Sequence, residues 1–480
     1  METSKDNKHA LSATEDAIVH ERAHSIAKGG SIPLDEAILQ AQGHGSAMPR
    51  RFYEMGLLRF WIQNLVYGGP QVVVFSLLAA AVVQWIVTLG LSELASAFPS
   101  TGGQYHFTYI VAPHRMKCGL AFMYILDTGV LEYWMIAAPV FLFPKAVPKI
   151  AQITMYLSVI GFFANFIVLV VMKKHTNPGS YIVQSGLGSS GWSAGTAWAL
   201  GVTNSMYAYA ATDSAIDIAE ECPSPQKVLP FVMNVTMTIG FSTAFPLFVL
   251  LMFGMTDLDA VVNAGLPSAE VMYQVTGSKA VSTFLMCWVL LVYVLCVIPQ
   301  WITCGRTAWA LATDNGTPFA QYFSHIDTTK DFPVRTTVCA VVFVCIYGLL
   351  YLASTTAYNS IVTGAVLCLN ITYAIPQTIM LLRGRSKCLL RRHLELGRTG
   401  YFCNLFSPLW VIVLAVLVCL PPSGPQVEVS TMNWTSPILA GLFLVTYVLW
   451  LVTGRHKFYG PKIDWDALNL SNGFEMQLDQ

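Results

Sequence analysis

Long apolar stretches alternate with short polar ones along most of this chain. A segment of about 20 apolar residues can cross the hydrocarbon core of a bilayer as an α-helix, and by that rule the sequence predicts about ten spans. They lie near residues 71–93, 118–143, 150–172, 194–213, 231–254, 280–302, 336–354, 360–382, 406–421 and 436–453. The pattern therefore predicts an all-α integral membrane protein with a polar tail over 1–50, a transmembrane domain over 51–454 and a second tail over 455–480.

The composition agrees with this class. Of the 480 residues, 54% are hydrophobic and 11% are charged, whereas soluble domains carry about 25% charged residues. The formal net charge of +0 gives no argument for a nucleic-acid partner. The cysteines are scattered without CxxC spacing, so they are expected to be small apolar residues of helices rather than a disulfide framework.

Basic residues indicate how the spans are oriented. They cluster after the eighth apolar stretch and at the start of the second tail, as Arg383, Arg385, Lys387, Arg391, Arg392, Arg398, Arg455 and Lys457. The positive-inside rule places both segments in the cytosol, and with them both termini of a plasma-membrane protein. The loop between the stretches 406–421 and 436–453 is then external. Asn433, in the sequon Asn433-Trp434-Thr435 of that loop, is the predicted glycosylation site.

Two regions do not fit the count of spans. Basic residues flank the stretch 118–143 on both sides, and Asp127 and Glu132 lie within it, so it resembles the start of one helix joined to the end of another. The apolar part of residues 51–70 contains Arg59 and is too short for an ordinary span. It is predicted to be an interfacial or partly inserted helix.

A polar run interrupts the fourth apolar stretch at Thr203–Glu221. Unpaired polar groups in hydrocarbon cost several kcal/mol each, so such a run is expected to line a cavity or contact a ligand. The predicted substrate-binding residues are Asn204, Ser205, Tyr207, Tyr209, Thr212 and Asp213. The alternative is a helix whose small residues pack closely against its neighbours.

Aromatic side chains near a buried carboxylate suit a solute with an ammonium or quaternary ammonium group, through cation–π attraction. Tyr207, Tyr209 and Trp301 could supply the rings beside Asp213. Trp301 also stands where an apolar stretch ends, and a membrane-interface anchor is its alternative reading.

Three runs resemble fungal amino-acid/choline permeases of the amino acid, polyamine and organocation transporter superfamily. They are LGLSELASAFPSTGGQYHF at 89–107, the Ala-rich polar run followed by AEECPSPQKVLP at 219–230, and CGRTAWALATDNGTPF at 304–319. The resemblance implies a LeuT-like fold of twelve helices with two inverted repeats, in which helices 1 and 6 are broken around the substrate. The chain departs from it where helix 1 is largely missing between Met55 and Tyr67, and where helices 3 and 4 are fused between Tyr133 and Pro144.

The resemblance also implies a gate at the cytosolic side. Gly102, Gly103 and Gln104 would contribute to closure, with a plain tight turn as the alternative. Asp213, Asp217 and Glu220 form one stripe of a helix, and Arg306 is a candidate partner for Asp213 or Glu220. A positive-inside residue that needs no partner is the other reading of Arg306.

The leading hypothesis is a secondary transporter that imports a small amine-bearing solute, such as an amino acid, choline or a related amine, by alternating access. Proton coupling is what the resemblance implies. A non-transporting solute sensor and an inactive, shortened permease are alternatives. A membrane enzyme is disfavoured because the histidines lie outside the spans and none has a second ligand at metal spacing. Neither a metal nor a cofactor is expected.

Overall fold

The structure is a computed structural model. It describes residues 60–100, 103–113, 116–122, 147–209, 212–221, 224–327, 333–353, 355–389, 392–424, 432–458 and 460. The elements that these residues form are all helices, which confirms the all-α class predicted from the apolar pattern. The predicted fusion of helices near Tyr133 and the tails over 1–50 and 461–480 lie outside the described residues.

Seven of the described helical segments are long and apolar enough to cross a membrane. They belong to α4 (Pro70–Ala97), α8 (Val147–Met172), α11 (Pro225–Gly254), α14 (Lys279–Thr313), α17 (Thr355–Arg383), α19 (Gly397–Val418) and α20 (Thr435–Leu449). The predicted stretch 336–354 forms α16 (Val334–Ala353), whose apolar described part is shorter. The stretch 118–143 lies mostly outside the described residues, so the number of spans stays a prediction.

Local sequence accounts for several helix ends. Pro70 and Pro225 stand in the first turn of α4 and α11, where the missing amide hydrogen of proline costs nothing. Gly277 adopts a left-handed conformation with φ of 65° and ends α13 (Pro267–Thr276), as glycine does at many helix C-termini. The boundaries of the long helices are thus set by residues whose backbone preferences match those positions.

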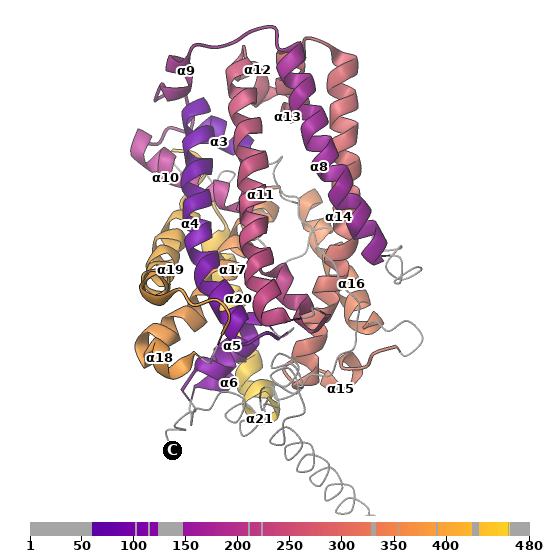
Figure 1. The fold of residues 1–480 in the computed structure, drawn as a ribbon, viewed down its shortest axis with the longest axis vertical. Helices are drawn as coiled ribbons and strands as arrows, with labels where there is room; N and C mark the ends of the chain where they lie inside the picture. Colours follow the sequence, from indigo (N-terminus) through magenta and orange to yellow (C-terminus); the bar gives the residue numbers. More distant parts are fainter. Residues whose placement is uncertain are drawn as a thin grey trace, which may run out of the picture.

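The helices form an elongated bundle (Figure 1). Helix α4 packs along α11, α8 along α14, and α17 along α19, while α3 (Phe60–Gly68) and α10 (Ala194–Ser205) both contact α4 and each other. One end of the bundle carries α9 (Gly179–Val183), α12 (Leu258–Asn263) and α13. The opposite end, called the α18 end here, carries α5 (Gly103–Val111), α6 (Lys117–Phe122), α15 (Ala320–Phe323), α18 (Arg385–Cys388) and α21 (Arg455–Lys457).

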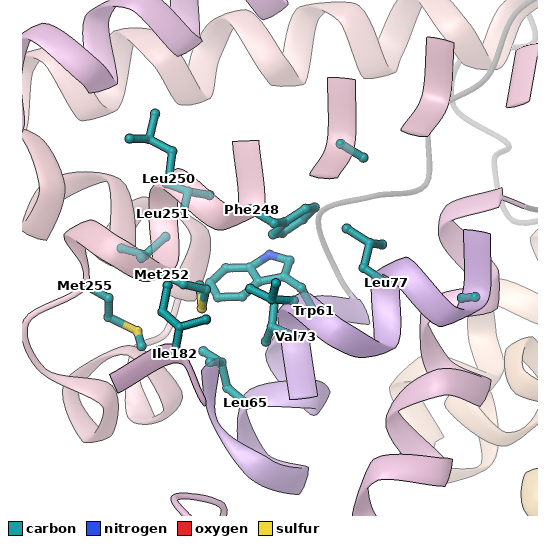
Figure 2. Packing of buried hydrophobic residues seen from close by; sticks show 14 of the residues in the cluster. Trp61, Leu65, Val73, Leu77, Ile182, Phe248, Leu250, Leu251, Met252 and Met255 are labelled. Carbon is teal, nitrogen blue, oxygen red and sulfur yellow. The ribbon is translucent and has the colours of Figure 1, made fainter. Parts of the chain in front are cut away.

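Helix α3 is inserted into the bundle. Trp61 and Leu65 are 4% and 1% exposed and belong to the largest apolar cluster. The Trp61 ring lies 6.0 Å from that of Phe248 on α11, and Figure 2 shows it among Val73, Met252 and Phe248. Full burial of a large apolar side chain stabilises a fold by about 1.5–3 kcal/mol. Residues 51–70 are predicted to be either an interfacial or a partly inserted helix. The burial of Trp61 and Leu65 favours insertion for the part that begins at Phe60.

The outward faces of several long helices are strongly apolar. Phe163, Ile167 and Val171 on α8 are 56%, 57% and 76% exposed, and Ile412 and Val416 on α19 are 64% and 62% exposed. Contiguous apolar surface of this kind marks a membrane or protein contact in a folded protein. Together with the length of the helices, it identifies a multi-pass membrane protein.

Candidate functional site

The fourth apolar stretch changes its helix type at the predicted polar run. Helix α10 ends at Ser205, and the chain continues as a 3-10 helix at Met206–Tyr209 (η3) and again at Thr212–Glu221 (η4). Runs of 3-10 helix longer than three or four residues are uncommon and often mark a functional hinge. The α-helix is thus interrupted within the run in the sense that it gives way to 3-10 helix after Ser205. Ala210 and Ala211 lie outside the described residues.

A polar cluster ties the last turn of α10 to two other helices. Asn64 Nδ2 on α3 donates to Ser205 Oγ at 2.7 Å and to Ser76 Oγ at 3.1 Å, and the two serine hydroxyls lie 2.8 Å apart. Asn204 Nδ2 donates to Asn64 Oδ1 at 2.9 Å. Two predicted substrate-binding residues, Asn204 and Ser205, therefore join α10 to α3 and α4. Asn64 and Ser76 were not predicted.

This cluster leads to a stability prediction. Replacing Asn64 by leucine removes the donors to Ser76 and Ser205 and leaves buried hydroxyls and an amide with fewer partners, which costs about 1–3 kcal/mol for each unsatisfied group. We expect a clearly lower melting temperature of the detergent-solubilised protein. Ile62→Leu, on the same short helix, is the matched control and should change the melting temperature little. Equal melting of the two variants would contradict a structural role for the cluster.

A second polar cluster surrounds Asp213, which is 9% exposed on η4. Gln104 Nε2 on α5 donates to Asp213 Oδ2 at 2.7 Å, and Tyr373 Oη on α17 donates to Asp213 Oδ1 at 2.6 Å. One residue earlier, Thr212 and Thr88 of α4 share a hydroxyl hydrogen bond of 3.1 Å. The predicted binding residues Thr212 and Asp213 and the predicted gating residue Gln104 are thus brought together. Tyr373 was missed.

The aromatic residues predicted for the site are buried. Tyr209 and Trp301 are 2% exposed, and neither the Tyr209 hydroxyl nor the Trp301 indole N–H has a hydrogen-bond partner. Tyr207 is half-buried and packs against the largest apolar cluster. Helix α14 continues to Thr313, twelve residues beyond Trp301, so Trp301 lies within the helix and is buried there. An interfacial anchor would face the headgroups, so this burial favours the binding-site reading of Trp301, whose role stays a prediction.

The other predicted gating residues are only partly described. Gly103 begins α5 with φ of 56°, a left-handed conformation that favours glycine. Gly102 lies outside the described residues, as do the side chains of Asp217 and Glu220 on η4. Arg306 is half-buried on α14. The gating role of these residues stays a prediction.

A contact at the α18 end joins two of the motifs found in the sequence. Tyr105 Oη on α5 donates to Asp314 Oδ2, just past the end of α14, at 2.6 Å. His106 Nε2 lies 3.7 Å from the same oxygen, and His106 Nδ1 lies 2.5 Å from Ser100 Oγ. The GGQYHF and ATDNG runs therefore fold against each other, which neither run predicts by itself.

A buried ion pair fixes the C-terminal end of α4. Glu93 is 0% exposed, and its carboxylate lies 2.6 Å from Arg385 Nη2 and 2.9 Å from Arg392 Nε. The Leu396 backbone N–H donates to Glu93 Oε1 at 3.3 Å. Helix α18, which begins at Arg385, ends at Cys388, where burial raises the pKa of the thiol. The helix is thus packed against the bundle at both ends. Glu93 was not predicted, although it lies in one of the quoted motifs.

Asn433, the predicted glycosylation site, caps two helices. Its Nδ2 donates to the carbonyl oxygens of Val418 and Leu420, both at 2.7 Å, and its Oδ1 accepts from Thr435 N at 3.0 Å. A glycan bonded to Nδ2 would remove at least one of these hydrogen bonds. Glycosylation at Asn433 stays a prediction. Among the described residues, no group of three His, Cys, Asp or Glu side chains could hold a metal ion.

Comparison with protein families gives one match that spans most of the chain. The family model described as "Amino acid permease" matches residues 128–444. A choline transporter of Saccharomyces cerevisiae is 26% identical over 465 residues, which cover 88% of this chain and 82% of that protein. A swainsonine transporter of Arthroderma benhamiae is also 26% identical and covers 85% and 89% of the two chains.

Two further comparisons extend these findings. Amino-acid permease 2 of Neurospora crassa is 24% identical and covers 92% of both chains. Among solved structures, a manganese transporter of Eremococcus coleocola matches with a TM-score of 0.39 at 15% identity, over 88% of this chain and 94% of that one. The family match and the three fungal relatives confirm the resemblance seen in the sequence motifs.

Proposed function

Because this chain belongs to the amino acid permease family, we propose that it is a secondary transporter that imports a small amine-bearing solute, such as an amino acid, choline or a related amine. The observation that carries the proposal is the buried Asp213 carboxylate at the interrupted helix. Its named donors, Gln104 and Tyr373, are neutral. A carboxylate can accept about four hydrogen bonds, so after these two it can still accept from an ammonium group.

The residues close to Asp213 in the sequence suit a cation. Tyr209 lies four residues earlier on η3 and offers an aromatic face together with a hydroxyl. A quaternary ammonium group cannot donate a hydrogen bond, and it is recognised by charge and by aromatic faces instead. An amino group can use both. The proposal therefore covers both solute types, and Asn204, Ser205, Tyr207, Thr212 and Trp301 are kept as candidate contributors to the site.

The change of helix type supports alternating access as the mechanism. Asp213 joins η4 to α5 and α17, while Ser205 joins the preceding helix to α3 and α4. Both parts of this span bond to α4, through Ser76 and Thr88, but the later part alone is described as bonded to α5 and α17. A hinge in the 3-10 segment can move one part against the other. Gly102, Gly103, Gln104, Asp217, Glu220 and Arg306 are the proposed gate at the α18 end. The basic residues of that end, including Arg383 and Arg385, suggest that it faces the cytosol.

Uptake into cells tests the proposal. Labelled choline and labelled alanine are supplied to yeast cells that lack their own carriers, with the protein in the plasma membrane. We expect saturable uptake of at least one probe, reduced several-fold when a protonophore collapses the proton gradient. Uptake that survives the protonophore would contradict proton coupling alone. Saturable binding without uptake would contradict transport and favour a solute sensor.

A further inference from the structure

Gln84, in the middle of α4, is a second unusual polar group at the interrupted helix. It is 1% exposed, and neither its Oε1 nor its Nε2 has a hydrogen-bond partner. A buried amide without partners is rare in native structures and calls for a specific explanation. Within a membrane-spanning helix the cost of leaving it unpaired is higher still, because no water is at hand.

Another buried glutamine of the bundle shows how such an amide is normally satisfied. Gln377 on α17 is 0% exposed, its Nε2 donates to the Val87 carbonyl at 3.2 Å, and its Oε1 accepts from Ser407 Oγ at 2.8 Å. A Cβ atom on Gly90 would collide with the Gln377 side chain, so α4 and α17 are fitted closely around it. Gln377 is therefore a packing residue, and Gln84 has none of these contacts.

Gln84 faces the interrupted helix. Two hydrogen bonds define the face of α4 that contacts this span, one from Ser76 to Ser205 and one from Thr88 to Thr212. With a step of about 100° per residue, Gln84 lies about 80° and Thr88 about 120° around the helix from Ser76. Gln84 is thus between the two hydrogen-bonding residues both along α4 and around it.

Gln84 also lies near the depth of Tyr209. The two hydrogen bonds show that α4 and the interrupted span run in the same direction. Along the axis of α4, Gln84 lies about 12 Å beyond Ser76, at 1.5 Å per residue. Along the parallel span, Tyr209 lies about 8 Å beyond Ser205, at the 3-10 rise of about 2.0 Å. The remaining difference is less than one helical turn, which side chains of this length can bridge. The Tyr209 hydroxyl, like the Gln84 amide, is buried and has no hydrogen-bond partner.

From this pair we infer that Gln84 and Tyr209 bind the oxygen-bearing end of the solute, and that Gln84 determines specificity for a hydroxyl or carboxylate oxygen near the amine. The amide N–H and the phenol O–H are both donors, which suits an oxygen acceptor. Asp213, which follows on η4, takes the amine end. This inference rests on the proposed function, because it names the second half of the same site.

The test uses pairs of compounds that differ only in the oxygen-bearing group. Uptake of labelled choline is competed with unlabelled choline or ethyltrimethylammonium, and uptake of labelled alanine with alanine or ethylamine. A site with unpaired donors rejects the analogue that lacks the acceptor. We expect the wild type to prefer the oxygen-bearing compound at least about tenfold, and Gln84→Met to bring this ratio close to one. Tyr209→Phe should also lower the preference for the oxygen-bearing compound.

Controls separate binding from folding. Gln84→Met removes an unpaired polar group, so its melting temperature should equal or exceed that of the wild type. Gln71→Met, in the first turn of the same helix, should leave the ratio unchanged. The inference is overturned if Gln84→Met keeps the wild-type ratio, if it lowers only the maximal rate, or if it lowers the melting temperature. If the wild type transports neither probe, the proposed function fails, and this inference fails with it.

Discussion

Asp213→Asn is expected to lower the uptake of an amine-bearing solute at least about tenfold, mainly through a higher KM. A hydrogen bond to a charged group contributes about 1.5–3 kcal/mol, and each 1.4 kcal/mol corresponds to a factor of ten in affinity. Asparagine keeps the size of the side chain, and its amide oxygen can still accept from the Tyr373 hydroxyl. Its amide N–H can donate to Gln104 if the Gln104 amide turns to present its oxygen. The fold should therefore survive while the negative charge is lost.

The control for Asp213→Asn is Asp259→Asn. Asp259 is exposed on α12, at the opposite end of the bundle, and its replacement should leave uptake unchanged. Tyr373→Phe removes one donor without removing the charge and should give an intermediate effect. Wild-type KM in Asp213→Asn, with a normal amount of folded protein, would remove Asp213 from the site.

Glu93→Gln is expected to destabilise the whole protein. Removing one partner of a buried ion pair costs about 3–5 kcal/mol, because the remaining charge stays buried without compensation. Arg385 is 3% exposed, so its guanidinium cannot reach water without opening the α18 end. We expect a large loss of protein that elutes as a single species after detergent extraction, and a melting temperature many degrees below that of the wild type.

Glu395→Gln provides a matched control for Glu93→Gln. Glu395 lies in the same loop as Arg392 but is exposed, and replacing an exposed charge changes stability by less than about 1 kcal/mol. Equal yield and melting of the two variants would show that the Glu93 ion pair does not hold the α18 end together.

The sequence predicts the long helices well for a physical reason. Burial of apolar residues in a bilayer depends on an unbroken local run, so stretches such as 150–172 and 231–254 are visible without any knowledge of contacts. The change of helix type at 203–213 coincides with a polar run, which is itself a local feature of the sequence. Its details depend on neighbours that are distant in the chain.

Those neighbours account for the contacts that the sequence does not predict. Tyr373 lies 160 residues from Asp213, and no local pattern indicates that the two meet. Gln84 is one polar residue in a strongly apolar helix, and a count of apolar residues passes over it. Asn204 and Ser205 are predicted to contact the solute because they are polar, and that role stays a prediction. Which way a side chain points around the helix axis is decided by packing, and these two face α3 and α4.

The most direct measurement is a cryo-electron microscopy density map of the protein saturated with a transported solute. The account predicts density for the solute between η3 and α4, with its amine toward Asp213 and its oxygen toward Gln84 and Tyr209. Solute density elsewhere in the bundle, out of contact with Asp213, Gln84 and Tyr209, would contradict the account.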